Sequence, residues 1–170
     1  MPKADKTNAM RLLDGRRIPY ATHTFSPDIH SAEGVAEAVG IPPEQVFKTL
    51  VVLSTAAKPQ PYLAIIPGHR ELDLKKLAQA TGEKKLRMAT QREAESLTGL
   101  QVGGISALAL LNKGFKVYLD ATAEAFDTIL VSAGQRGINL QLAVADLVKV
   151  VNARLADLSA HLDPPAPRMV

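Results

Sequence analysis

The sequence predicts a single mixed α/β (α+β) domain in which helices flank a mixed, largely antiparallel, barrel-like sheet. Short alternating or β-branched runs are interspersed with helical patterns along the chain. Their order shows neither the strict strand–helix–strand alternation of a parallel doubly wound sheet nor an internal repeat. At 170 residues the chain is long enough for one core, and no shift in composition marks a domain boundary.

Five helices are expected, and most of them carry end signals. Thr90 and Glu93 form a capping box at the start of one helix, and Asp73 is a good N-cap for another. Gly40 and Gly99 directly follow two of the helical patterns, and Gly82 closes a third. The expected helices cover residues 6–15, 32–39, 74–80, 91–98 and 143–151.

Seven strands are expected between these helices. They are rich in β-branched and apolar residues or alternate in polarity, and turn residues bound them. The expected strands cover residues 20–25, 46–53, 62–66, 86–89, 116–119, 128–132 and 138–142.

One charged residue interrupts the most strand-like segment, residues 46–53. Side chains alternate along a strand, so Lys48 shares a face with Val46, Leu50 and Val52. A buried ammonium group is costly, and its pKa falls unless a partner or ligand holds the charge. Such a lysine protects an edge strand, reaches water along its stem, or marks a functional site.

Two glycine-containing turns are the other candidates for a site. In residues 98–106, adjacent Gly103 and Gly104 allow positive φ and a close approach of a ligand to backbone N–H groups. In residues 131–137, the hydroxyl of Ser132 and a guanidinium lie among flexible glycines. Neither turn has the spacing of a P-loop or a dinucleotide fingerprint. Taken alone, each is better explained as a hairpin or bulge turn.

Several classes of chemistry are disfavoured. The chain has no cysteine, which excludes disulfide scaffolds, thiolate metal sites and cysteine nucleophiles. Its four histidines form no HxxxH pair and none lies beside a carboxylate at ligand spacing, so neither a metal nor a cofactor is expected. Ser106 and Ser132 lack the G-x-S-x-G context of a serine nucleophile.

The charge and the hydropathy of the chain limit the kinds of binding partner that it can have. The net charge of +3 is compatible with an RNA partner but does not establish one. Lysine pairs at 75–76 and 84–85, with Arg87 and Arg92, form either a solvated surface or a weak, salt-sensitive contact with RNA phosphates. No signal-peptide run opens the chain and no segment is long enough to span a bilayer, so a cytoplasmic protein without membrane contact is expected.

The ordered set of these segments resembles the YbaK/EbsC family of aminoacyl-tRNA deacylases, relatives of the editing domain inserted in bacterial prolyl-tRNA synthetases. The similarity runs from about residue 8 to residue 158. The matching segments are residues 47–52, 98–99 with 102–106, 131–134 with 136–137, 22–25 and 36–40. The resemblance implies that this chain has a pocket between its sheet and its helices. It also implies that the chain hydrolyses the ester joining a wrong amino acid, classically cysteine in this family, to tRNA(Pro).

The resemblance also assigns residues. Lys48 takes the place of the family's essential lysine, which binds phosphate or ribose near the tRNA 3′ end, and Gly103 and Gly104 contact the aminoacyl ester through their backbone. The substrate-binding positions implied in the same way are Phe25, Thr49, Ile105, Ser106, Ser132, Gly134 and Arg136. Two departures, Ala107 in place of a proline and Ser31 near a position that can be aromatic, bear on amino-acid specificity.

The expected chemistry is non-covalent. An aminoacyl ester is already activated, so its hydrolysis needs mainly orientation and stabilisation of the developing oxyanion. Lys48 is expected to anchor the terminal nucleotide while glycine N–H groups polarise the carbonyl, and water or a substrate group such as the cysteine thiol attacks.

Two other interpretations stay open. The deacylase acts on alanyl- or another aminoacyl-tRNA, or the chain is a non-catalytic tRNA- or synthetase-binding module on the same fold. Prolyl-tRNA synthetase is expected to assist tRNA selection. The functional domain is expected to cover residues 1–160, and the proline-rich tail, residues 161–170, is expected to be disordered.

Overall fold

The computed structural model describes residues 6–29 and 31–160. The tail predicted for residues 161–170 lies outside these residues. The α-helices are α1 (Asn8–Gly15), α2 (Ala32–Val39), α3 (Leu74–Thr81), α4 (Gln91–Thr98) and α5 (Val144–Val151). Three short 3-10 helices are η1 (Pro43–Gln45), η2 (Leu108–Leu110) and η3 (Ala121–Ala125).

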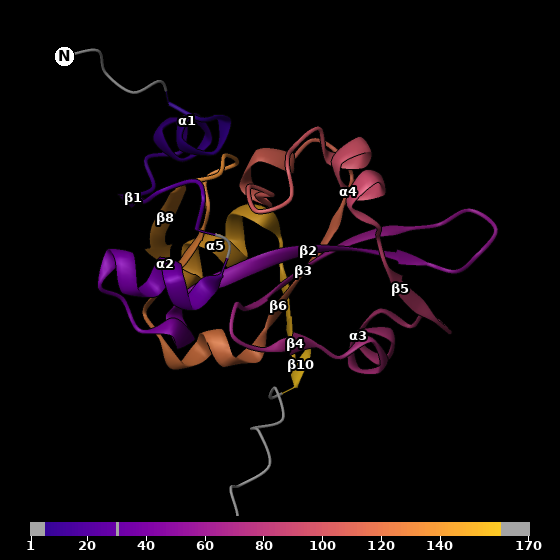
Figure 1. Cartoon of the computed structure of the whole chain (residues 1–170). Coiled ribbons are helices and arrows are strands. Elements are labelled where there is room, and N and C mark those ends of the chain that lie inside the picture. The colour runs from indigo at the N-terminus through magenta and orange to yellow at the C-terminus, as the bar shows by residue number, and fades with distance from the viewer. Residues whose placement is uncertain (1–5, 30, 161–170) are drawn as a thin grey trace, which may run out of the picture.

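The strands form three sheets (Figure 1). The strands are β1 (Ala21–Thr24), β2 (Phe47–Ser54), β3 (Pro61–Pro67), β4 (Glu71–Leu72), β5 (Leu86–Met88), β6 (Lys116–Asp120), β7 (Thr128–Ser132), β8 (Ile138–Ala143), β9 (Arg154–Ala156) and β10 (Ser159–Ala160). All predicted helices and strands are confirmed to within two residues at each end, whereas β4, β9 and β10 were not expected.

The largest sheet has the strand order β5-β2-β3-β6-β9. Its β5, β2 and β3 are antiparallel neighbours, and β6 joins β3 and β9 in parallel. A second antiparallel sheet has the order β1-β8-β7, and β4 pairs with β10. The predicted mixed, largely antiparallel architecture is therefore confirmed. The described strands do not close into a barrel, because only one parallel bridge, Val46 to Leu130, joins the two larger sheets.

Local signals fix the helix that borders the site. The Ser31 hydroxyl accepts the Gly34 N–H at 3.0 Å at the start of α2. Gly40 ends this helix in the left-handed conformation, with φ of +72°, which glycine adopts without steric cost. The helix thus has defined ends on both sides, and its Val35 and Ala36 pack against Val46 and Leu130.

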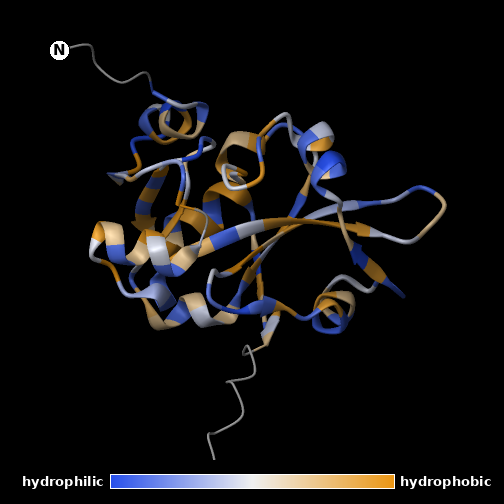
Figure 2. Ribbon diagram, in the orientation of Figure 1, coloured by the Kyte–Doolittle hydropathy of each residue, from blue (hydrophilic) through white to orange (hydrophobic). Residues whose placement is uncertain are grey.

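The core lies on both faces of β2. Phe47 and Val51 pack into a large cluster that includes side chains of α1, α5 and β8. Val52 points to the opposite face, into a second cluster beneath α3 with Ile66 and Leu77. Figure 2 shows hydrophobic residues along β2 and β3 and hydrophilic residues on α4. Burial on both faces explains why β2 reads as a nearly continuous apolar run.

The outer edge of β2 is only partly paired. β5 covers its last residues, and the Ala89 N–H donates to the Val51 carbonyl at 3.0 Å. At the other end the Val46–Leu130 bridge connects β2 to β7. Between these two contacts, within the described part of the chain, no strand pairs with this edge of β2. The gap leaves room for a pocket.

Candidate active site

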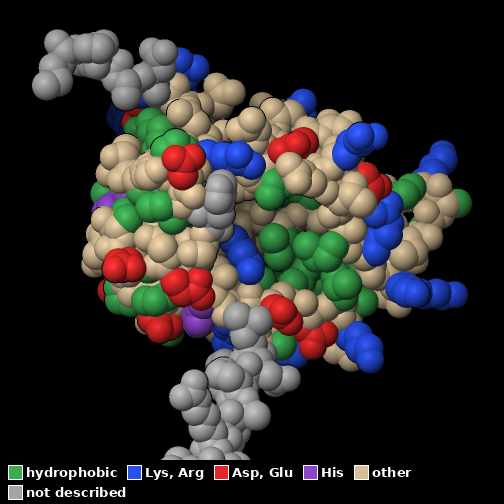
Figure 3. Space-filling model, in the orientation of Figure 1, with side chains coloured by type: hydrophobic (Ala, Val, Ile, Leu, Met, Phe, Trp, Pro, Cys, Tyr) green, Lys and Arg blue, Asp and Glu red, His purple; other side chains and the backbone are tan. Residues whose placement is uncertain are grey.

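A pocket of about 600 Å³ opens at the unpaired edge of β2. Its walls come from α2 and the loop before it, β2, the β5–α4 connection, and the two glycine-containing turns. Figure 3 shows the hollow on this face of the molecule, with Lys or Arg side chains on either side of it.

Seven of the ten predicted site residues line this pocket. They are Phe25, Lys48, Thr49, Gly103, Ile105, Ser132 and Arg136. The other three, Gly104, Ser106 and Gly134, lie behind the wall and support it. A Cβ on Gly104 would lie 3.0 Å from backbone atoms of Gln135 and Arg136, so only glycine allows the two turns to pack this closely. Ser106 is 1% exposed, and the Gly134 N–H donates to the Ser132 hydroxyl at 3.1 Å.

Lys48 lies at the gap in the sheet edge. Its ammonium group donates to the Gly68 carbonyl at 3.2 Å. The side chain is half-buried, and this burial lowers the pKa of Lys48, while the negative charges of Glu33 and Glu71 oppose the shift. A single neutral acceptor leaves the ammonium group with donors to spare for an anionic ligand.

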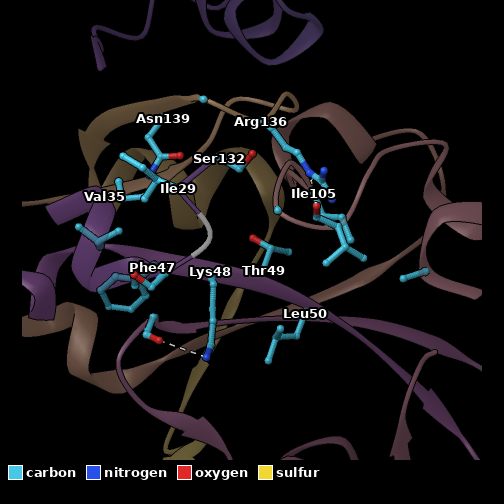
Figure 4. A pocket seen from close by; sticks show the side chains of 18 of the residues that line it. Ile29, Val35, Phe47, Lys48, Thr49, Leu50, Ile105, Ser132, Arg136 and Asn139 are labelled. Carbon is cyan, nitrogen blue, oxygen red and sulfur yellow. Dashed lines mark hydrogen bonds between the residues drawn. The ribbon is translucent and has the colours of Figure 1, made fainter. Parts of the chain in front are cut away.

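The pocket wraps around the edge of β2. Figure 4 shows Lys48 and Leu50 leaving the strand on one side, whereas Thr49 points the other way, toward Ser132 and Arg136. This follows from the alternation of side chains along a strand. A ligand that contacts both Lys48 and Thr49 therefore has to cross the free edge of the strand.

The two glycine-containing turns are joined by Arg136. Its Nε donates to the Val102 carbonyl at 2.8 Å. Gly103 has φ of +93°, a conformation that favours glycine, and it faces the pocket. The remaining N–H groups of the guanidinium make no hydrogen bond among the described residues, and they can bind an anion or a carbonyl oxygen.

Sequence reasoning missed Asn139. This side chain is 7% exposed, lines the pocket, and lies directly opposite Ser132 in the β7–β8 register. Alternation along β8 places Asn139 on the same face as Gln141, which was the available signal. Gln141 bonds to His23 and Thr128, however, so the pattern alone does not separate a structural amide from one that faces a ligand.

Apolar side chains on the α2 side of the pocket were also missed. These are Ile29, Val35 and Phe47, which lie across from Ser132 and Asn139 and form an apolar wall of the pocket (Figure 4). A subsite of this kind accepts a small side chain and rejects a strongly charged one, because an unpaired charge there would be desolvated.

The pocket lacks the pairings of covalent catalysis. Ser132 accepts a backbone N–H, and no described histidine lines the pocket beside it. Among the described residues no group of three His, Asp or Glu side chains is placed to hold a metal ion. No helix within residues 6–29 and 31–160 has the length and apolarity needed to cross a membrane. What the site offers is cations, amides and backbone groups, which bind and polarise a substrate.

Comparison with known sequences defines the family. A model described as the aminoacyl-tRNA editing domain matches residues 26–150. EbsC of Enterococcus faecalis, provisionally named a Cys-tRNA(Pro)/Cys-tRNA(Cys) deacylase, is 42% identical over 156 residues, which cover 91% of this chain and 93% of EbsC. The proline–tRNA ligase of Fervidobacterium nodosum is 23% identical over 125 residues, which cover 74% of this chain and 21% of the ligase.

Solved structures show the same fold. The hypothetical protein APE2540 superposes with a TM-score of 0.82 at 23% identity, covering 90% of this chain and 99% of that one. A structure described as a trans-editing enzyme for prolyl tRNA synthetase, also a provisional name, gives a TM-score of 0.75 at 25% identity, covering 92% of this chain and 99% of that one.

Fold, pocket and family model agree on the class of protein, an aminoacyl-tRNA editing domain, and the predicted enzyme class of aminoacyl-tRNA deacylase is confirmed. The match to EbsC extends over nearly the whole of both chains. This chain belongs to the YbaK/EbsC family.

Proposed function

We propose that this pocket hydrolyses the ester that joins a wrong amino acid to tRNA(Pro), with cysteine as the preferred amino acid. One observation carries the proposal: a single pocket is lined by Lys48 on one side of the free edge of β2 and, on the other, by Ile105 and Arg136, which belong to and bond to the Gly103 turn. An aminoacylated ribose spans such an edge, with its phosphate toward the ammonium group and its ester toward the glycine backbone. The provisional names of EbsC and of the trans-editing structure support the choice of tRNA(Pro) and cysteine.

Binding and polarisation supply the catalysis in this proposal. Binding holds the ester against the glycine turn in a fixed orientation, which lowers the entropic cost of reaching the transition state. N–H donors aimed at the carbonyl oxygen stabilise the negative charge that develops on it. The attacking group is water or the thiol of the substrate cysteine. Either attack breaks the ester bond and returns the ribose hydroxyl to the tRNA, and neither requires a covalent bond to the protein.

The amino-acid side chain fits the subsite between the apolar wall of Ile29, Val35 and Phe47 and the polar side chains of Ser132 and Asn139. Cysteine and alanine are both small enough for its apolar wall, and one added atom changes binding in such a subsite by only about 1–3 kcal/mol. Discrimination between them therefore depends on contact between the cysteine sulfur and the polar base of the subsite.

A panel of aminoacylated tRNAs tests this function. Cys-tRNA(Pro), Ala-tRNA(Pro), Pro-tRNA(Pro) and Cys-tRNA(Cys) are incubated with the purified protein, and the loss of the labelled amino acid is followed against spontaneous hydrolysis. We expect Cys-tRNA(Pro) to be cleaved fastest and Pro-tRNA(Pro) to be spared. Faster cleavage of Ala-tRNA(Pro) would reassign the specificity, and tight tRNA binding without any cleavage would leave only a binding module.

We also propose that prolyl-tRNA synthetase helps to select the tRNA. A mildly basic chain of this size offers little surface for reading a whole tRNA. Adding the synthetase is expected to raise the cleavage of Cys-tRNA(Pro) relative to Cys-tRNA(Cys). An unchanged ratio would contradict this role. An enzyme with these partners acts where translation takes place, in the cytoplasm.

A further inference from the structure

The Lys48 side of β2 carries an apolar surface that ester cleavage does not use. Leu50 follows Lys48 on this face, and Met88 of β5 lies opposite Val52 in the register. Leu50 and Met88 are therefore diagonal neighbours on one face of the sheet, a separation of about 7–8 Å that long side chains bridge. Both residues line the pocket.

The exposure of Met88 is unusual for this chain. At 41% it is one of four large apolar side chains among the described residues that are this exposed. A single exposed apolar residue is ordinary, but Met88 lies beside Leu50, which itself packs against the cluster beneath α3. Figure 3 shows hydrophobic side chains gathered beside the hollow, in contact with a basic side chain.

Positive charge borders this surface beyond Met88. Lys84 and Lys85 are exposed just before β5, and Arg92 is exposed in the first turn of α4. Lys85 lies three extended residues from Met88, about 10 Å along the strand. Arg87 contributes less, because it is paired with Glu93 at 2.7 Å.

We propose that Leu50 and Met88 form a platform for the terminal nucleobase of the tRNA 3′ end, with Lys48 beside its phosphate. The unpaired nucleotides that precede it then run along Lys84 and Lys85. This inference rests on the proposed function and adds to it the subsite that holds the nucleotide.

Three features favour a nucleobase over a protein as the occupant. The platform consists of two side chains, far smaller than the roughly 1,000 Å² that a specific protein interface needs. It lies between Lys48 in the pocket and exposed Lys84 and Lys85, which suits a base next to the phosphates of a single strand. It is also continuous with the ester site, since a ribose at the free edge of β2 places its base on the Lys48 side and its aminoacyl group on the Thr49 side.

The test compares Met88→Ala with Leu155→Ala. Leu155 is 40% exposed on β9, at the far edge of the same sheet, and it does not line the pocket. Neither substitution removes a core side chain, and thermal unfolding of each variant verifies its fold. Binding of the trinucleotide CCA and of an analogue without the terminal base is measured by titration, together with KM for Cys-tRNA(Pro).

We expect wild-type protein and Leu155→Ala to bind CCA at least about fivefold more tightly than the abasic analogue, because the face of the base buries apolar surface against Leu50 and Met88. In Met88→Ala this preference is lost and KM rises by a similar factor. A preference that survives in Met88→Ala, or is absent from the wild type, would overturn the platform. If the wild type binds CCA as expected but cleaves none of the panel, the proposed function fails and the platform stands.

Discussion

Replacing Gly103 by alanine separates its part in the site from its part in the fold. Gly103 has φ of +93°, and an added Cβ would lie 3.4 Å from the Arg136 Nε, which is an ordinary contact. The cost is therefore conformational, about 1–2 kcal/mol for a residue with a side chain at positive φ. Gly82, at the end of α3, has φ of +79° and nothing within 4 Å of an added Cβ, so its replacement carries a similar cost away from the pocket.

The two variants are expected to differ in activity and not in stability. For each, Tm falls by about 2–8 °C, as a loss of 1–2 kcal/mol implies in a chain of this size. Gly103→Ala shifts the backbone donors at the ester, and a displacement of about 1 Å costs about 100-fold in rate. The assay is single-turnover deacylation of Cys-tRNA(Pro) beside thermal unfolding. A wild-type rate in Gly103→Ala, or an equal loss in Gly82→Ala, would refute the reasoning.

Three further substitutions test other parts of the structure. Because burial lowers the pKa of Lys48, the unfolded chain holds this proton at a higher pH than the folded chain does. Lys48→Met should therefore raise the free energy of unfolding at neutral pH, and this gain should shrink as the pH rises toward 10.5. Urea titrations at several pH values measure the gain, and a gain that does not change with pH would contradict the reasoning. Asp120→Ala removes a buried carboxylate that accepts two N–H groups before and within β10, and it should cost about 2–3 kcal/mol in chemical denaturation while deacylation is retained. Gly68→Ala brings a Cβ into collision with that of Ala32. It should cost about 1–3 kcal/mol and lower activity by displacing the carbonyl that accepts from Lys48. Adding Ala32→Gly should restore activity, and no recovery would argue against the clash.

The helices were predictable because their determinants are local. The capping box of Thr90 and Glu93 forms as expected, with reciprocal bonds of 3.1 and 3.0 Å. Strand β10 was missed because its determinant is distant in sequence. Asp120 accepts N–H groups of Leu158 and Ser159 at 2.8 and 3.1 Å and fixes that segment beside β4. No sequence pattern within residues 158–160 predicts hydrogen bonds to Asp120.

The candidate site was predictable only in part, for a related reason. Alternation along one strand places Lys48 with Leu50, and they share a side of β2 in Figure 4. The edge of β2 is unpaired at this point because β5 and β7 contact it only on either side. Where those strands pair is determined by the whole sheet and not by the sequence of β2. The same holds for Met88 and Asn139, which reach the pocket from other strands.

Single-turnover deacylation of Cys-tRNA(Pro) by Lys48→Ala tests the central claim most directly. Lys48 donates to one backbone carbonyl, and its half-buried ammonium group costs desolvation in the folded state. If Lys48 anchors the tRNA 3′ end across the free edge of β2, cleavage falls to the spontaneous rate while Tm is not lowered. A folded Lys48→Ala that cleaves Cys-tRNA(Pro) at the wild-type rate would contradict the account.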